Sequence, residues 1–304
     1  MARKSFQTGI VLNKKTKDKI FICGMLFLPI CSFLVFYVYT NLNSILIAFQ
    51  IPSSSDSYTW GIDHFLTMFK EFSLSGSVLS SALKNTMLFF FSGILITFPL
   101  SFVLCYFIYK KIAGYRFFRV VFYLPNIISA SVIAILFKYM IAGNGPISVL
   151  YAWTGKEIPN FLSNSSYAMG TLIFYNIFFG LGGNIILFSG AMSNIDNGII
   201  EAAKIDGVGM MTEMIKIIIP LMWPTMSTVL LFQFIGIFNA SGPILLLTKG
   251  AYDTFTLSYW IYDRVAFSSD LNYPAAVGLF FTIIGAQLAM FFRWVLTRGL
   301  EDVA

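Results

Sequence analysis

Hydrophobic residues form six long runs along the chain, separated by shorter stretches rich in polar side chains. The runs lie near residues 20–40, 86–109, 118–141, 167–192, 225–247 and 275–297. A helix needs roughly 20 apolar residues to cross about 30 Å of hydrocarbon, so each run is long enough to span a membrane. The pattern predicts an all-α, polytopic membrane protein with six transmembrane helices, whose two termini lie on the same side.

The composition supports this prediction. Of the 304 residues, 57% are hydrophobic and only 11% are charged, a balance outside the range of soluble domains. A basic arm over residues 1–19 precedes a transmembrane domain over 20–304. The first run is long for a signal peptide, lacks a small-residue cleavage site and precedes five further runs, so we expect an uncleaved first span.

Lysine and arginine indicate the orientation of the spans. They gather in the N-terminal arm, in the connection after the second run and in the C-terminal tail (Arg3, Lys4, Lys14, Lys15, Lys17, Lys19, Lys110, Lys111, Arg116, Arg119, Arg293 and Arg298). Because basic segments stay in the cytoplasm, both termini are expected there, and segments 50–85, 142–166 and 248–274 outside. The net charge of +6 then reflects topology and requires no nucleic-acid partner.

One polar, glycine-containing segment, residues 195–220, interrupts the hydrophobic second half. Asp196 can cap a short helix, and Gly207 lies where a left-handed residue ends one. Ile195, Ile199 and Ala202 share one face of this helix. A second helical pattern over 210–219 is expected to stop at Pro220.

This segment offers an apolar surface flanked by Glu201, Lys204 and Asp206, which suits docking of another protein. The periodicity fits an ordinary amphipathic connection between two spans equally well.

Polar residues within the later spans are candidates for a solute pathway. Asn176 and Gly180 lie one helical turn apart in an aromatic stretch, and Gln233 lies inside the fifth run. A buried amide is costly unless it bonds to a helix or a ligand. A polar notch beside aromatic rings suits a sugar, whereas the glycines alone are also typical of close helix packing.

The chain has no visible energy source of its own. The central parts of the spans contain no Asp, Glu, Lys, Arg or His, which disfavours a proton-coupled carrier, although a sodium site built from carbonyls stays open. A phosphate-binding G-x-x-x-x-G-K-[ST] loop is also missing. Cys23, Cys31 and Cys105 all lie in spans and are interpreted as reduced packing residues, and His64 as an interfacial one. We therefore expect this chain to bind neither metal nor cofactor.

The spacing of Glu201-Ala202-Ala203, Gly207 and Pro220 resembles the EAA motif in the cytoplasmic coupling loop of bacterial ABC importer permeases. Leu124-Pro125 and the surrounding chain, over nearly all of residues 20–300, resemble the carbohydrate-uptake branch, which includes maltose, glycerol-phosphate and oligosaccharide importers. Three residues depart from that pattern: Asp196 replaces the usual proline, Ile219 replaces leucine, and Gly198 weakens the first helix.

The resemblance implies a type I importer permease fold with a coupling helix, and it assigns roles to individual residues. The coupling residues would be Ile199, Glu201, Ala202, Ala203, Asp206, Gly207 and Pro220. The candidate pathway residues are Asn126, Asn176, Phe179, Gly180, Gly183, Gln233, Ile237, Asn239 and Ala240.

The resemblance also implies partners. They are a second, related permease in a heterodimer, a cytoplasmic ATPase dimer that uses ATP and Mg²⁺, and an external solute-binding protein, assembled in the bacterial plasma membrane. The expected function is import of a neutral carbohydrate, with an oligosaccharide favoured. The alternatives are an importer for a polyol or glycerol phosphate, a scaffold protein, and a membrane enzyme of lipid-linked sugar metabolism, for which the chain lacks a cluster of acids or histidines.

Overall fold

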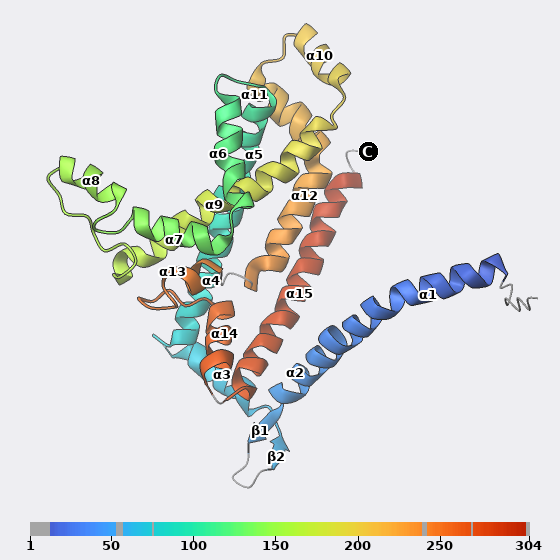
Figure 1. Cartoon of the computed structure of the whole chain (residues 1–304), viewed down its shortest axis with the longest axis vertical. Helices are drawn as coiled ribbons and strands as arrows, with labels where there is room; N and C mark the ends of the chain where they lie inside the picture. Colours follow the sequence, from blue (N-terminus) through green and yellow to red (C-terminus); the bar gives the residue numbers. More distant parts are fainter. Residues whose placement is uncertain (1–12, 53–56, 75, 239–241, 269, 302–304) are drawn as a thin grey trace, which may run out of the picture.

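The chain folds into a tall bundle of long helices with a small hairpin at one end and the helix α10 at the other (Figure 1). The computed structural model describes residues 13–52, 57–74, 76–238, 242–268 and 270–301. Residues 1–12 of the predicted basic arm, and Asn239 and Ala240 of the predicted pathway, lie outside these ranges. The all-α prediction is confirmed, with the addition of a two-stranded antiparallel hairpin that the sequence pattern did not indicate.

The elements follow one another in this order. The first half contains α1 (Lys14–Phe33), the π-helical η1 (Leu34–Tyr39), α2 (Thr40–Ala48), β1 (Gln50–Pro52), β2 (Tyr58–Trp60), α3 (Asp63–Ser73), α4 (Val78–Ser92), the π-helical η2 (Gly93–Thr97), α5 (Phe98–Tyr109), α6 (Tyr115–Ile127), α7 (Ala130–Met140) and α8 (Pro146–Trp153). The second half contains α9 (Ser165–Ser193), α10 (Asn197–Ile205), α11 (Met210–Glu213), the π-helical η3 (Met214–Ile218), α12 (Ile219–Ile235), the 3₁₀ turn η4 (Gly236–Phe238), α13 (Gly242–Leu247), α14 (Leu257–Phe267) and α15 (Asn272–Glu301).

Within the described residues, five continuous helical units are long and apolar enough to cross a membrane: Lys14–Ala48, Val78–Tyr109, Ser165–Ser193, Met210–Phe238 and Asn272–Arg298. A sixth crossing needs α6 and α7 together, which are bent by 115° at their junction. The hydrophobic run over 118–141 therefore does not form one continuous helix. Ile128 and Ser129 are extended, and the Ser129 hydroxyl accepts a hydrogen bond from the Val132 amide and so starts a new helix.

The prediction that a helix stops at Pro220 is also wrong. The fifth unit starts at Met210 and continues through Pro220 to Phe238, and α13 follows as a separate short helix. Pro220 lies in the first turn of α12, directly after the wide π-helical turns of η3. The wide π-helical turns already interrupt the regular i→i−4 hydrogen-bond pattern before Pro220, so the proline is accommodated without ending the helix.

The main core lies where α5, α9, α10 and α12 meet. Its largest fully buried side chains include Tyr106, Phe188 and Met222, and the Phe188 ring packs edge-on against Phe102 with centroids 5.7 Å apart. Cys105 is buried here as predicted, but Cys23 and Cys31 are exposed on α1. The core therefore joins the α10 segment directly to the long helices.

Polar side chains fasten the hairpin end of the molecule. The Asn85 amide on α4 donates to the carbonyls of Asp253 and Phe255, at 2.7 and 2.9 Å. His64 lies 3.0 Å from the Gln50 carbonyl, in accord with a structural role at the surface. Asn272, at the start of α15, donates to the same Gln50 carbonyl. These bonds fix one end of α4, which lines the pocket, and one end of α15, which packs along α12.

Candidate functional site

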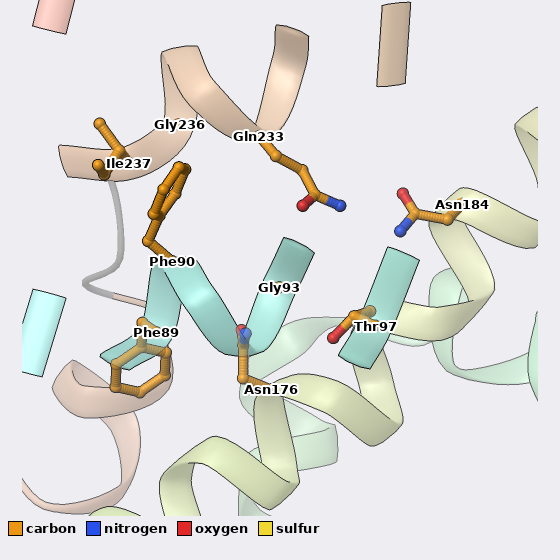
Figure 2. A pocket seen from close by; sticks show the side chains of 10 residues that line it. Phe89, Phe90, Gly93, Thr97, Asn176, Asn184, Gln233, Gly236 and Ile237 are labelled. Carbon is orange, nitrogen blue, oxygen red and sulfur yellow. The ribbon is translucent and has the colours of Figure 1, made fainter. Parts of the chain in front are cut away.

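A pocket of about 320 Å³ lies between three helical units, α4 with η2, α9, and α12 with η4 (Figure 2). Its lining consists of Phe89, Phe90, Gly93, Thr97, Asn176, Gly180, Asn184, Gln233, Gly236 and Ile237. No ionisable side chain is among these residues. The pocket can therefore offer hydrogen bonds and aromatic contact, but no charge to balance a charged solute.

The α9 wall of the pocket follows helical geometry. Asn176, Gly180 and Asn184 follow one another at intervals of four residues and fall on one face of the helix. The two amides therefore lie one turn before and one turn after the space left by Gly180. A Cβ on Gly180 would lie 3.6 Å from Cγ2 of Thr97 on η2. An alanine would thus fit in ordinary contact with η2, and the glycine leaves additional room between the two amides.

Gln233 forms the opposite polar wall. Its side chain points from α12 toward Asn184 across the pocket (Figure 2). Its Oε1 is buried and has no hydrogen-bond partner among the described residues. Oε1 lies 3.4 Å from the position that a Cβ would take on Gly93, so a larger residue there would crowd the amide. A buried acceptor without a partner costs about 1–3 kcal/mol, which a donating hydroxyl in the pocket would recover.

Aromatic rings form the apolar side of the pocket. Phe89 and Phe90 follow one another on α4 and both line the pocket beside Asn176 and Ile237. The Phe90 ring is also packed edge-on against Phe234, with centroids 5.1 Å apart. Amides on one side and aromatic faces on the other match the hydroxyl edges and C–H faces of a sugar ring.

Four of the predicted pathway residues meet in this pocket: Asn176, Gly180, Gln233 and Ile237. Phe179 instead packs against Tyr175 and Phe137, with ring centroids 4.6 and 6.1 Å away. Of the other lining residues, Thr97 and Asn184 carry polar groups that the sequence-based list missed. Asn184 could have been found from its four-residue spacing to Gly180 and Asn176.

Asn126 and Gly183 lie outside the pocket, at the contact between α6 and α9. A Cβ on Gly183 would be 3.6 Å from Asn126 Oδ1, and a Cβ on the neighbouring Gly182 would collide with the Asn126 amide and the Phe122 carbonyl. Close helix packing therefore accounts for Gly182, and the placement of Asn126 and Gly183 in the pathway is not supported by the pocket's geometry.

The α10 segment has the predicted caps. The Asp196 carboxylate accepts a hydrogen bond of 2.9 Å from the Gly198 amide, and Gly207 adopts φ +72°, a left-handed conformation that favours glycine. Pro220 lies beyond this helix, inside the unit that runs from Met210 to Phe238.

The two faces of α10 differ in burial. Ile200 and Ala203 pack inward, whereas Ile199 and Ala202 are exposed on the face that the sequence pattern offered for docking. Ile205 is 86% exposed, and Glu201, Lys204 and Asp206 are exposed around it. An apolar, charge-flanked surface is thus available to a partner.

An ion pair anchors the chain that follows α10. Lys110 Nζ, at the end of α5, lies 2.6 Å from Oε1 of Glu213, the last residue of α11. The Tyr106 hydroxyl donates to the Met210 carbonyl at 3.0 Å and approaches Glu213 Oε1 at 3.3 Å. Sequence reasoning missed this cluster, since it treated Lys110 only as a topology signal and did not single out Glu213.

Comparisons with known proteins agree with this architecture. Residues 103–302 match the family model described as a binding-protein-dependent transport system inner membrane component. The chain is 23% identical to the arabinooligosaccharides transport system permease protein AraP of Bacillus subtilis, with 93% of this chain and 89% of AraP covered. It is 28% identical to the sn-glycerol-3-phosphate transport system permease protein UgpA of Escherichia coli, with 79% and 81% covered.

The fold is also found in a solved structure. A chain of the bacterial alginate ABC transporter, solved in complex with an alginate pentasaccharide-bound periplasmic protein, superposes with a TM-score of 0.82 at 22% identity. The superposition covers 95% of this chain and 98% of that chain. At this identity the likeness establishes the fold alone.

Proposed function

Since this chain belongs to the family of binding-protein-dependent transport system inner membrane components, we propose that it forms half of the pathway of an ATP-driven importer for a neutral oligosaccharide. Family membership makes the chain a multi-pass membrane permease and sets aside the alternative of a membrane enzyme. The solute, the partners and the orientation are the proposed parts.

The observation that supports a neutral solute is the uncharged lining of the pocket. Its polar groups are three amides and one hydroxyl, and two phenylalanines form its apolar side. The names of the relatives include both neutral and anionic solutes. Arabinooligosaccharides are neutral, whereas glycerol phosphate and alginate are anionic. Moving an anion from water into such a pocket is costly without a cation to balance it. A neutral sugar needs only the hydrogen bonds that the pocket offers.

A second permease chain would complete the pathway. The pocket opens to the outside of this chain, and α1 projects from the body with none of its residues buried (Figure 1). Phe21, Phe27 and Phe36 on this first helical unit are each more than two-thirds exposed. A related permease, with lipid around the pair, would cover these surfaces and close the pocket.

The remaining partners are an ATPase dimer and an external solute-binding protein. The exposed surface of α10 around Glu201 and Ile205 would dock on the ATPase dimer, which would bind ATP and Mg²⁺. The solved alginate transporter carries a periplasmic protein, which supports delivery of the solute by such a protein here. Closure of the ATPase dimer would push α10 and switch the pathway between inward-facing and outward-facing states.

The proposed orientation places α10 in the cytoplasm. The basic 110–119 connection, α10 and the end of α15 all lie at one end of the molecule, and the hairpin lies at the other (Figure 1). A cytoplasmic location for all three agrees with the retention of basic segments inside the cell.

The test is uptake by the complete transporter in proteoliposomes, with binding protein outside and ATP on the ATPase side. The probes are arabinotriose and maltotriose as neutral oligosaccharides, and trigalacturonate and sn-glycerol 3-phosphate as anions. We expect ATP-dependent uptake of a neutral probe and little uptake of the anions. Uptake confined to the anionic probes, or uptake that does not require ATP, contradicts the proposal.

A further inference from the structure

An ion pair with a buried carboxylate joins the ends of two pocket-lining units. Glu213 is 2% exposed, and Lys110 Nζ contacts both of its carboxylate oxygens, at 2.6 and 2.7 Å. The Lys110 ammonium also lies 5.9 Å from the centroid of the Tyr106 ring. Tyr106 is itself fully buried, and its hydroxyl donates a hydrogen bond to the Met210 carbonyl. The three side chains and one backbone group form a compact cluster, here called the Lys110–Glu213 link.

The link lies where α10 is connected to the rest of the chain. After α10 the chain turns at Gly207 and reaches Met210, the first residue of α11, three residues later. Tyr106 binds the carbonyl of Met210, and Lys110 binds Glu213 at the other end of α11, so both ends of this short helix are attached to α5. Ile200 on α10 belongs to the same core as Tyr106 and Met214. A displacement of α10 is therefore transmitted to α5 through apolar packing and through the link.

Both helices that leave the link reach the pocket. Going back along the chain, α5 leads to η2, which provides Thr97 and Gly93. Going forward, η3 and α12 lead to Gln233. At 1.5 Å per residue, Thr97 and Gln233 lie about 20 and 30 Å along their helices from the link. The π-helical segments η2 and η3 interrupt the regular α-helical pattern on these two routes, as such segments often do at functional sites.

A buried ion pair suits such a connection better than apolar contact would. Apolar contact is non-directional, whereas the hydrogen bonds from Lys110 to both oxygens of a buried carboxylate are directional, and breaking them would leave an unpaired buried charge. A buried pair contributes little net stability, and its best-attested use is to specify register. The placement of Lys110 at the C-terminal end of α5 also lets it interact favourably with the helix dipole.

We propose that the Lys110–Glu213 link carries the displacement of α10 to the pocket by making the end of α5 and the helical unit from α11 to α12 move as one body. Lys110, Glu213 and Tyr106 are then positioning residues for transport. The inference rests on the proposed function, because it requires an ATPase that moves α10.

The test measures how nucleotide changes access to the pocket, and it needs no transported solute. Cys23 and Cys31, exposed on α1, are replaced by serine, and Asn184→Cys places a reporter in the pocket. The complete transporter in inverted vesicles is labelled with a membrane-impermeant maleimide, with and without a non-hydrolysable ATP analogue. In the parent, nucleotide should change the labelling rate by about fivefold or more, the usual size of coupling between distant sites.

The measured quantity is the ratio of the labelling rates with and without nucleotide. Lys110→Met and Glu213→Gln should each bring this ratio close to one. The exchanged pair, Lys110→Glu with Glu213→Lys, should restore most of the nucleotide effect seen in the parent. Lys111→Met is the matched control, since it removes the neighbouring exposed lysine and should keep the parent ratio. Assembly is measured on native gels, and labelling is expressed per assembled complex.

Two results overturn the inference: parent ratios in both single variants, or no recovery in the exchanged pair although the complex assembles. An absent nucleotide response in the parent is a different result, because it contradicts the proposed ATP-driven coupling itself.

Discussion

Gln233 is the residue whose surroundings point most directly to a ligand, because its buried Oε1 has no partner in the described part of the chain. Gln233→Leu should raise KM for the neutral oligosaccharide roughly fivefold, as expected for one lost hydrogen bond of about 1 kcal/mol. The thermal stability of the purified transporter should rise, since the orphan acceptor disappears. Uptake kinetics and a thermal unfolding assay measure the two effects.

The control for Gln233 lies on the same helix. Thr228 is exposed on α12, and its hydroxyl donates to the Pro224 carbonyl on the same helix, so Thr228→Val should leave KM unchanged. An unchanged KM in Gln233→Leu would exclude a contact between this amide and the solute.

Gly182 provides a second prediction, at the contact between α6 and α9. A Cβ there would collide with the Phe122 carbonyl and the Asn126 amide, so Gly182→Ala should cost about 1–3 kcal/mol despite the higher helix propensity of alanine. Gly190 is the matched control on α9, since a Cβ there meets nothing within 4 Å. Thermal unfolding should show a loss only for Gly182→Ala. Equal stability of the two variants would contradict the packing role.

The element that carries the coupling prediction is α10. Glu201→Lys should lower uptake and co-purification of the ATPase by at least about tenfold, because reversing a charge in an interface costs several kcal/mol. Membrane insertion should persist, because Glu201 is exposed. Glu157→Lys makes the same change in an exposed loop distant in sequence and should behave like the parent. Normal uptake by Glu201→Lys would argue against α10 as the docking element.

The elements were predictable from sequence where a local signal determines them. Hydrophobic run length located the spans, and Asp196 and Gly207 located the ends of α10, because caps act through hydrogen bonds a few residues away. The break between α6 and α7 was not indicated by the length of the hydrophobic run, because it depends on Ser129, which caps α7, and not on Pro125, which lies inside α6. Pro220 was misread because a π-helical turn before it cannot be recognised from periodicity.

The pocket was predictable only in part, since it depends on which helices meet. Asn176, Gly180 and Gln233 stood out as polar or small residues in apolar runs. Phe89 and Phe90 look like any other apolar residues of a span, and only the packing of α4 against α9 and α12 makes them a wall. The Lys110–Glu213 pair joins residues 103 positions apart, a separation over which periodicity carries no information.

At the scale of the whole molecule, every proposed role depends on which side of the membrane α10 occupies. In the variant with serine at positions 23 and 31, produced without the ATPase, Ile205→Cys should react with an impermeant maleimide only in inverted vesicles, because Ile205 is 86% exposed in this chain beside the basic end of the bundle. Tyr58→Cys, on the hairpin at the opposite end, should react only in intact cells or spheroplasts. Reaction of position 205 from outside would place α10 beyond the reach of a cytoplasmic ATPase. The pocket would then need another source of energy, even if the fold and the solute were as proposed.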